Sequence, residues 1–567
     1  MLVATVVLIE MVAVSKLHRR LLTVMMVAMT TILAFVASPE TARAADAGAI
    51  TIGGDVATQY DAYQLFSATV TDKAGSDQKV ATDLAWASDA ARQAVLPVLY
   101  DAGFDSSAST AQEAAEWLNA DGHMSTALAA RLACTICNAG AASVPLNAGV
   151  AAELPCGYWL IVADDDAIDQ GEAGTAPIMA LVGGGAVTVK PKAATPKVAK
   201  HVLEDSTAVW QKAADATVGD DLYWRLSATV PAGLTAYDTY TVRFVDTMSA
   251  GLDPSKVAAS MRVYVAAGAD GGFDAVSAGR DGRAGTEPAK GWTDITAQCA
   301  TKVAADGKTF TVRTGDLIAA LGGADAFTAG SRVVAVYNAP LNSACNHGIA
   351  KGNPNEVYLR YPRSPFADQS GDAGFTRTPS DDACAYTWDL ALTKRGSDGD
   401  KPLAGAVLSI ADDRGRTLAA DGTWDAEGKA TVTTGEDGRV TVSGVDSGKL
   451  EVRELKAPKG YTAFEGTRSV TVKAEGLDVD QVAAAKPKLT ITAESPLRAD
   501  SADGSTGSLE ASLINTPTGT PPSITTGGFM PSTGDMAMYA AAAAAVAGAA
   551  LIVVALLVKR GGGSHKE

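Results

Sequence analysis

Residues 450–461 read Leu-Glu-Val-Arg-Glu-Leu-Lys-Ala-Pro-Lys-Gly-Tyr, and this stretch shows the pattern on which the fold prediction rests. Apolar and charged residues alternate from 450 to 453, which is typical of a strand with one buried face. The Pro-Lys-Gly sequence that follows is typical of a turn. Strands followed by turns rich in Pro and Gly indicate a β protein.

The same pattern continues on both sides of this stretch, from residue 383 to residue 517. Short alternating segments are separated by Gly, Asp and Asn, as the two sheets of an immunoglobulin-like sandwich require. We expect strands at residues 386–394, 406–411, 439–442, 450–453, 467–472 and 509–515. A Pro/Thr/Gly-rich segment, 518–529, follows and is typical of a flexible linker.

A second sandwich is predicted for residues 192–376, where the alternation recurs. Strands are expected at 222–230, 240–244, 262–266, 310–312, 332–337 and 357–361. Residues 45–191 differ because they also carry helix signals, such as the capping box formed by Thr110 and Glu113. The predicted fold is therefore mostly β: tandem immunoglobulin-like sandwiches after an α+β N-terminal domain.

The 383–517 segment resembles the CnaB-type domains of Gram-positive pilins. Three motifs carry the resemblance: Leu-Thr-Lys ending at Lys394, the 450–461 stretch with its Glu454, and Ile-Asn-Thr-Pro with Asn515. The resemblance implies that Lys394 and Asn515 form an internal isopeptide bond. Glu454 matches the glutamate that assists this reaction, which occurs once in each chain.

The chemistry of these three residue types supports that implication. Burial disfavours the charge on Lys394 and leaves a nucleophilic amine. The same burial favours a neutral Glu454, which can polarise the carbonyl of Asn515 by hydrogen bonding. Attack by the amine then expels ammonia. Lys394 lies in the first expected strand and Asn515 in the last, and these strands can run side by side.

The middle segment resembles the same pilin domains but departs from them at one position. Lys200 lies in its first strand, and Asp246 matches the acidic residue of the family. The last strand ends in Tyr-Pro-Arg-Ser-Pro, which aligns Arg363 with the reacting asparagine. We therefore expect no isopeptide bond here, and instead a salt bridge from Asp246 to Lys200 or Arg363. A bond would require a shifted register that brings in Asn353 or Asn355.

Between the first two domains, the chain reads Val-Thr-Val-Lys-Pro-Lys, ending at Lys192. This segment resembles the pilin motif of backbone pilins. The resemblance implies that the amine of Lys192 receives the next subunit, with Lys190 or Lys197 as alternatives. An amine that must reach an enzyme-bound acyl group is expected on an exposed edge.

The C-terminal segment, 530–567, has three parts in a characteristic order. An uncharged apolar run, 536–558, is long enough to cross a bilayer as a helix and is followed by Lys-Arg. The pentapeptide before it resembles the LPXTG sorting signal of Gram-positive surface proteins. The resemblance implies that a sortase cuts after Thr533 and joins this residue to Lys192. The pentapeptide consists of Met530, Pro531, Ser532, Thr533 and Gly534.

The N-terminal segment, 1–44, is typical of a signal peptide. Basic residues at 16–20 precede an apolar run at 21–37, and Ala-Arg-Ala ends at Ala44. Cleavage is expected after Ala44, and the initiator is Met1 or Met11. The mature chain is thus expected outside the cell, at the cell wall, with its precursor held in the membrane by 536–558.

The net charge of −17 argues against nucleic acid as a partner. No paired Cys-x-x-Cys motifs occur, and only five His are present, so we expect no metal and no cofactor. Export permits disulfides, whose pairing stays open; Cys134 and Cys137, with or without Cys156, and Cys299 with Cys345 are candidates. The six cysteines are Cys134, Cys137, Cys156, Cys299, Cys345 and Cys384.

Taken over the whole chain, the resemblance implies a structural subunit of a covalent surface fibre rather than a turnover enzyme. Its expected partners are a pilin-specific class C-type sortase, a housekeeping sortase with peptidoglycan, other copies of itself and accessory pilins. The adhesion ligand is unknown. The alternative is a wall-anchored adhesin, or an accessory pilin at the tip or base of a fibre.

Overall fold

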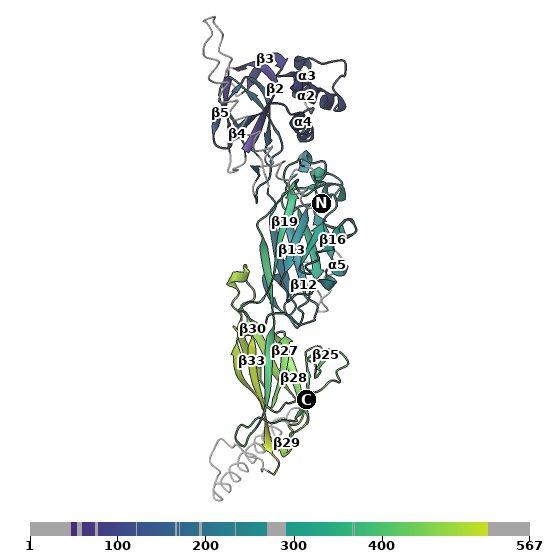
Figure 1. Cartoon of the computed structure of the whole chain (residues 1–567), viewed down its shortest axis with the longest axis vertical. Helices are drawn as coiled ribbons and strands as arrows, with labels where there is room; N and C mark the ends of the chain where they lie inside the picture. Colours follow the sequence, from purple (N-terminus) through teal and green to yellow (C-terminus); the bar gives the residue numbers. More distant parts are fainter. Residues whose placement is uncertain are drawn as a thin grey trace, which may run out of the picture.

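The computed structural model arranges the chain as three domains in a row, mostly of β structure (Figure 1). It describes residues 47–53, 59–73, 78–120, 122–164, 167–168, 170–191, 195–232, 234–268, 291–365, 367 and 369–519. The expected signal peptide, the pentapeptide and the apolar run 536–558 lie outside these residues. Within the described ranges, no helix is long and apolar enough to cross a bilayer.

The first domain is α+β, as predicted. One sheet has the order β3-β2-β6-β7 with β4 beside β2, and a smaller one has the order β5-β1-β8. The helices pack on the larger sheet around Phe66 and Leu160. The elements are β1 (Ala47–Ile52), β2 (Gln59–Asp72), β3 (Lys79–Trp86), α2 (Asp89–Asp101), α3 (Ala111–Asn119), α4 (Thr126–Asn138), β4 (Val144–Asn147), β5 (Ala151–Pro155), β6 (Gly157–Ala163), β7 (Ile178–Val182) and β8 (Val187–Val189).

The helices begin where local hydrogen bonding favours it. The hydroxyl of Ser88 accepts from the backbone of Ala91 at the start of α2. The predicted capping box of Thr110 and Glu113 forms at the start of α3. Each cap satisfies backbone N–H groups that have no partner within the helix, and this fixes the first turn.

The middle domain is a sandwich of two sheets around one apolar core. The first sheet has the order β10-β9-β12-β18-β14-β15, and the second has β11-β21-β19-β13-β17-β16 with β20 beside β19. The elements are β9 (Val198–Glu204), β10 (Val209–Gln211), β11 (Ala213–Asp215), β12 (Tyr223–Thr229), β13 (Arg243–Met248), α5 (Val257–Ser260), β14 (Arg262–Ala266), β15 (Trp292–Asp294), β16 (Ala300–Val303), β17 (Thr309–Arg313), α6 (Leu317–Ala320), β18 (Arg332–Asn338), β19 (Asn353–Pro362), β20 (Phe375–Arg377) and β21 (Asp381–Tyr386).

The third domain is also a sandwich with its own core. One sheet has the order β27-β22-β33-β29 with β32 beside β33, and the other has β25-β24-β23-β28-β30-β31 with β26 beside β23. The elements are β22 (Trp388–Gly396), β23 (Val407–Ala411), β24 (Thr417–Leu418), β25 (Trp424–Asp425), β26 (Val432–Thr433), β27 (Arg439–Val445), β28 (Gly448–Lys456), β29 (Tyr461–Thr462), β30 (Thr467–Glu475), β31 (Lys488–Ala493), β32 (Leu497–Asp503) and β33 (Ser508–Pro517).

The boundary between the two sandwiches differs from the predicted one. Residue 383 was expected to open the third domain, but it lies inside β21, which pairs with β19 and β11 of the middle domain. Only Thr387 separates β21 from β22. The sequence contains no Gly or Pro at this point, so the two strands read as one, and the middle domain extends to Tyr386.

The first joint is made by the loop between β6 and β7, which reaches into the middle domain. Ala173 of this loop is buried in the middle domain's core. The N–H of Gly174 donates to the carbonyl of Arg363 at 2.7 Å, and the hydroxyl of Tyr361 donates to the carbonyl of Glu172 at 2.6 Å. These contacts hold the first domain against the end of β19.

The second joint combines strand pairing with side-chain contacts. The indole N–H of Trp388 donates to Asp215 at 2.6 Å, and the N–H of Val218 donates to the carbonyl of Gly444 at 2.8 Å. Trp388 belongs to the third domain's core, which also includes Ala213 from the middle domain. The two sandwiches therefore share buried surface as well as a covalent connection.

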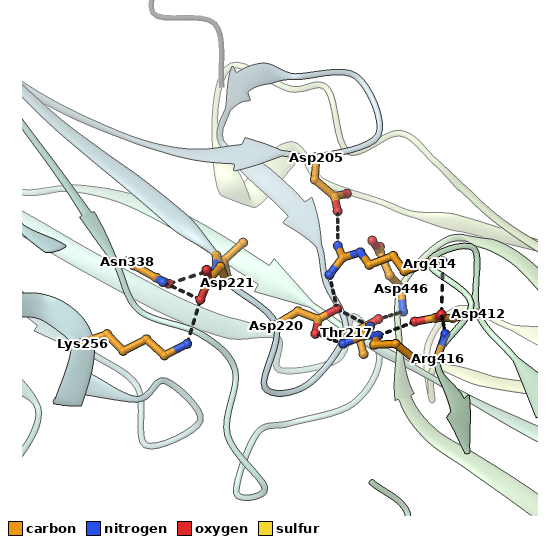
Figure 2. A network of polar contacts seen from close by, with 11 residues as sticks. Asp205, Thr217, Asp220, Asp221, Lys256, Asn338, Asp412, Arg414, Arg416 and Asp446 are labelled. Carbon is orange, nitrogen blue, oxygen red and sulfur yellow. Dashed lines mark hydrogen bonds and ion pairs between the residues drawn. The ribbon is translucent and has the colours of Figure 1, made fainter. Parts of the chain in front are cut away.

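Charged side chains surround this second joint (Figure 2). Arg416 of the third domain makes two hydrogen bonds to the carboxylate of Asp220 in the middle domain, at 2.5 and 2.7 Å. Arg414 lies between Asp220, at 2.9 Å, and Asp205, at 3.3 Å. A planar guanidinium that bonds a carboxylate twice fixes orientation as well as distance.

Candidate functional site

The predicted trio of the third domain comes together in the structure. We call Lys394, Glu454 and Asn515 the C-terminal site. Strands β22 and β33 run parallel, with Lys394 opposite Leu513. Since alternate residues of a strand share one face, Asn515 lies on the same face as Lys394. Glu454 comes from β28 in the facing sheet, so the three side chains meet inside the sandwich.

The contacts in the C-terminal site are those of a compact polar cluster in an apolar core. The Nδ2 of Asn515 donates to both carboxyl oxygens of Glu454, at 2.9 and 3.0 Å. The Nζ of Lys394 lies 3.5 Å from Glu454 Oε1 and donates to the carbonyl of Leu513 at 3.3 Å. The Lys394 and Glu454 side chains are fully buried. One carboxyl group thus touches both the amine and the amide.

Burial sets the proton state of the lysine. Desolvation lowers the pKa of Lys394 to about 8, and the nearby Glu454 opposes that shift only in part. A substantial neutral fraction is then available near neutral pH. The Oδ1 of Asn515 is buried and has no hydrogen-bond partner among the described residues. A half-turn of the carboxamide would place this oxygen against Glu454, where a neutral acid could donate to it.

A second cluster of the same residue types lies in the middle domain. We call Lys200, Asp246, Tyr337 and Asn355 the middle site. Lys200 on β9 and Tyr337 on β18 belong to one sheet, whereas Asp246 on β13 and Asn355 on β19 belong to the other. In the antiparallel pairing of β13 with β19, Asn355 stands opposite Met248 and Asp246 opposite Val357. Asp246 and Asn355 are therefore diagonal neighbours on one face.

All four side chains of the middle site are fully buried. Lys200 forms an ion pair with Asp246 through Oδ2, which confirms one of the two predicted salt bridges. The hydroxyl of Tyr337 accepts from Lys200 Nζ at 2.9 Å and from Asn355 Nδ2 at 2.8 Å. It donates to Asp246 Oδ2 at 3.0 Å. Asn355 is thus one hydroxyl group away from the lysine and the acid.

Burial also shifts proton equilibria in the middle site. Desolvation lowers the pKa of Lys200 to about 8, against the opposing effect of Asp246. Desolvation raises the pKa of Asp246, and Lys200 offsets part of that rise. Both shifts favour the uncharged forms, a neutral amine beside a neutral acid. These are the forms that an attack of the amine on an amide requires.

The register of β19 contradicts the predicted role of Arg363. Arg363 lies just beyond the end of β19, where its carbonyl accepts from Gly174 of the first domain. Asn355 is eight positions earlier, which is about 26 Å along an extended strand. The asparagine that reaches the Lys200–Asp246 pair is therefore Asn355, through the shifted register that the sequence left open. Asn353, also buried, instead bonds the carbonyl of Asn346 at 2.9 Å.

The middle site contains one residue that the sequence offered only as an alternative, Asn355, and one that it did not indicate, Tyr337. The inward positions of β19 read Asn353, Asn355, Val357, Leu359 and Tyr361, and all five are buried. Polar amides on an otherwise apolar face indicate buried hydrogen bonding. Tyr337 ends an apolar run on β18 and reads as an ordinary core residue, so its hydroxyl contacts appear only in the structure.

The predicted disulfides do not form. All six cysteines are thiols, including Cys299 and Cys345 of the middle domain. The thiol of Cys299 donates to the carbonyl of Ile295 at 3.3 Å. In the first domain, Cys134 and Cys137 lie exposed on α4 while Cys156 is buried beside Gly183.

The described residues hold no group of His, Cys, Asp and Glu suited to a metal ion. Several predicted residues lie outside the described part of the chain: the attachment lysine Lys192, the cleavage residue Ala44 and the pentapeptide Met530, Pro531, Ser532, Thr533 and Gly534. The two alternative lysines, Lys190 and Lys197, are described, and both are exposed.

Comparison with known proteins supports the resemblance to pilins. A family model described as a SpaA prealbumin-like fold domain matches residues 389–486. The trypsin-resistant surface T6 protein of Streptococcus pyogenes serotype M6 is 30% identical over 143 residues, which cover 24% of this chain and 24% of that protein. The alignment thus spans about a quarter of the curated relative.

Solved pilin structures are also similar to this chain. The T6 backbone pilin of Streptococcus pyogenes has a TM-score of 0.47 and 16% identity, over 85% of this chain and 100% of that one. The major pilin SpaD of Corynebacterium diphtheriae has a TM-score of 0.40 and 15% identity, over 83% and 98%.

Proposed function

We propose that this chain is a structural subunit of a covalently polymerised surface fibre, a backbone pilin of the sortase-assembled kind. The observation that carries the proposal is the C-terminal site, a buried lysine, glutamate and asparagine, of which Lys394 and Glu454 lie within the residues that the family model matches. A mechanical role explains why reactive groups are sealed in a core, where no outside substrate reaches them.

In the C-terminal site, the neutral amine of Lys394 attacks the side-chain carbonyl carbon of Asn515. A new C–N bond forms, the bond to Nδ2 breaks, and Nδ2 leaves as ammonia with a proton that originates on the amine. Glu454 touches both nitrogens, so it can carry this proton from one to the other. The bond would join the first and last strands of the domain.

In the middle site, we propose the same reaction between Lys200 and Asn355, with Asp246 as the acid. Three features support it: complete burial, a lysine whose pKa is lowered, and an asparagine held beside the Lys200–Asp246 pair. This replaces the expectation, based on Arg363, that the middle domain has no bond. It would tie the two sheets of that sandwich together.

Intact-mass measurement of the purified, reduced ectodomain tests these internal bonds. Each bond expels one ammonia and lowers the mass by about 17 Da. We expect two such losses, one assigned by peptide mapping to the Lys394–Asn515 pair and one to the Lys200–Asn355 pair. A single loss, mapped to the third domain, would refute the proposed middle-domain bond. No loss at all would refute both proposed bonds.

We further propose that subunits are joined from Thr533 to Lys192 of the next copy by a pilin-specific sortase. The exposed cell-surface location and the final transfer to peptidoglycan by a housekeeping sortase belong to this proposal. Its support is the order of the sequence motifs, together with two exposed lysines, Lys190 and Lys197, on either side of Lys192.

Polymer formation in cells tests the attachment lysine. With Lys192→Ala, we expect the high-mass ladder on a denaturing gel to disappear, because no other lysine accepts the acyl group. Lys190→Ala and Lys197→Ala are the matched controls and should leave the ladder intact. If the ladder survives all three changes, the assignment of the attachment lysine to this segment fails; if the unaltered protein forms no ladder, the fibre proposal fails and a wall-anchored adhesin becomes the better explanation.

A further inference from the structure

The hydroxyl of Tyr337 lies at the centre of the middle site, and we propose that it is a catalytic group for the Lys200–Asn355 bond. This inference rests on the proposed middle-domain bond. The hydroxyl is the group through which amine, amide and acid are connected: it accepts from Lys200 and Asn355 and donates to Asp246. Its two lone pairs and its proton are all in use.

The need for such a group follows from the length of the acid. In the C-terminal site, Glu454 reaches Lys394 and Asn515 with one carboxyl group. The middle site has an aspartate, which is one methylene shorter. Asp246 contacts Lys200 directly but bonds to Tyr337, which in turn holds Asn355. The hydroxyl of Tyr337 therefore connects Asp246 to Asn355, whereas in the third domain the longer Glu454 contacts Asn515 directly.

The hydroxyl is also held in the state that this role requires. Desolvation, together with the neighbouring Asp246, raises the pKa of Tyr337 well above its ordinary value, so it stays protonated. The ring is fixed by an edge-to-face contact with Phe310, at a centroid distance of 4.8 Å. Lys200 Nζ lies 5.4 Å from the ring centroid. A rigid, protonated hydroxyl keeps the amide nitrogen within reach of the acid.

The step balances with the groups present. Lys200 Nζ bonds to the carbonyl carbon of Asn355 and passes one proton to Asp246. Asp246 passes a proton to Tyr337, and Tyr337 gives its own proton to Nδ2 of Asn355. The carbon–Nδ2 bond then breaks and ammonia leaves. For this transfer the hydroxyl turns its proton from Asp246, to which it donates at rest, toward Nδ2, whose lone pair becomes available once the amine has added. Both Asp246 and Tyr337 end the step in the state in which they began.

Replacing Tyr337 with phenylalanine removes the hydroxyl and keeps the ring. We expect Tyr337→Phe to slow the middle-domain bond about a hundredfold or more, the size typical of a lost acid–base group. The full-length ectodomain is made in a short cell-free pulse, and the two 17 Da losses are followed by intact mass and peptide mapping. The Lys394–Asn515 bond in the same molecules should form at its normal rate.

Tyr361→Phe is the matched control, because Tyr361 is another fully buried tyrosine of the same domain whose hydroxyl bonds elsewhere, to Glu172. It should leave the middle-domain bond unaffected. Normal bond formation in folded Tyr337→Phe protein would overturn the inference, whether or not the variant melts earlier, since the hydroxyl would then serve folding alone. Absence of the bond in the unaltered protein would instead overturn the proposed bond itself.

Discussion

The middle and C-terminal sites each combine a buried lysine, an acidic side chain and an asparagine, yet they are built differently. In the third domain, Lys394 and Asn515 lie on adjacent parallel strands of one sheet, and the acid comes from the facing sheet. In the middle domain, the lysine is on one sheet, and Asp246 and Asn355 are on the other. A bond in the first case joins neighbouring strands, and a bond in the second joins the two sheets.

This difference shows that strand topology sets which asparagine lies near the buried lysine. In the third domain, β22 and β33 are the first and last strands, and they pair directly. In the middle domain, the first strand β9 pairs with β10 and β12, so its lysine faces the opposite sheet. An alignment that assumes one arrangement for both domains therefore selects the wrong partner, as it did with Arg363.

The largest expected effect comes from removing the middle lysine. Lys200→Ala prevents the bond between sheets and leaves the buried carboxyl of Asp246 without its hydrogen-bond donor. The lost covalent cross-link costs about 2–4 kcal/mol, and the unsatisfied buried acceptor adds about 1–3 kcal/mol. We expect the middle domain's unfolding transition, measured with denaturant, to shift by the sum.

Lys212→Ala is the control for this effect. Lys212 lies in the same domain, is largely buried and pairs with Asp381. Its other hydrogen bonds go to the backbone carbonyls of Lys200 and Asp382, and none of these partners is an asparagine side chain. Its removal should lower the domain's stability only by the contribution of its ion pair with Asp381, which is partly exposed. Equal shifts for the two variants would mean that Lys200 contributes no covalent bond, and the contrast between the two domains would then be one of packing alone.

Replacing each acid with its amide tests whether the two bonds form independently. Glu454→Gln keeps the shape of the side chain but removes the acid that touches Lys394 and Asn515. We expect the third domain to lose its 17 Da change and about 2–4 kcal/mol of stability, while the middle domain keeps its bond. Asp246→Asn should give the reverse result. Peptide mapping of each variant measures both outcomes, and loss of both bonds in either variant would contradict the independence of the sites.

The three residues of the C-terminal site were predictable because each of them, Lys394, Glu454 and Asn515, lies in a short motif that can be read from the local sequence. The strands of the middle domain were also largely predictable; residues 332–337 were expected and β18 spans Arg332–Asn338. The asparagine near Lys200, Asn355, could not be predicted with the same certainty, because its position depends on how β19 is aligned with strands far away in the sequence. A chain with no turn residue before Thr387 likewise concealed the end of the middle domain.

The joint between the two domains should weaken as pH rises. Glu204, Asp205 and Asp446 meet there, and burial is the first cause that raises the pKa of each, to about 8 for Glu204. The neighbouring carboxyl groups of Asp215, Asp205 and Glu204 add to the rise in the pKa of Asp446. Asp215 adds negative charge, and Arg414 provides partial compensation.

The sign of the pH effect follows from proton binding. The closed joint raises the pKa of Asp446 well above its ordinary value, so this group's contribution to the joint's stability is complete below the ordinary pKa and is lost as pH rises through the raised one. Each retained proton is worth about 1.4 kcal/mol per pH unit over that window. We expect hydrogen-exchange protection at the Val218 amide, which bonds to the carbonyl of Gly444 across the joint, to fall between pH 6 and 9.

Asp446→Asn is the variant that sharpens this test. An amide replaces the carboxyl whose pKa is raised most strongly and keeps a hydrogen-bonding group of the same size. Protection at the joint should then depend less on pH, while the two internal bonds, measured by mass, stay unchanged. An unaltered pH dependence in this variant would show that the carboxyl group of Asp446 does not control the joint. The remaining charges nearby, Arg416, Asp220 and Asp413, are common to both proteins.

The smallest expected effect is that of a reducing agent. This measurement tests whether a disulfide, rather than the proposed lysine–asparagine bond, cross-links the middle domain. Burial raises the pKa of Cys299 and Cys345 to about 11 each, so these thiols are almost entirely protonated near neutral pH and react slowly. Reductant should therefore leave the melting temperature unchanged, and a thiol reagent should modify the exposed Cys134 and Cys137 first. A fall in melting temperature on reduction would instead assign the bracing of the middle domain to a disulfide, and the lysine would lose that role.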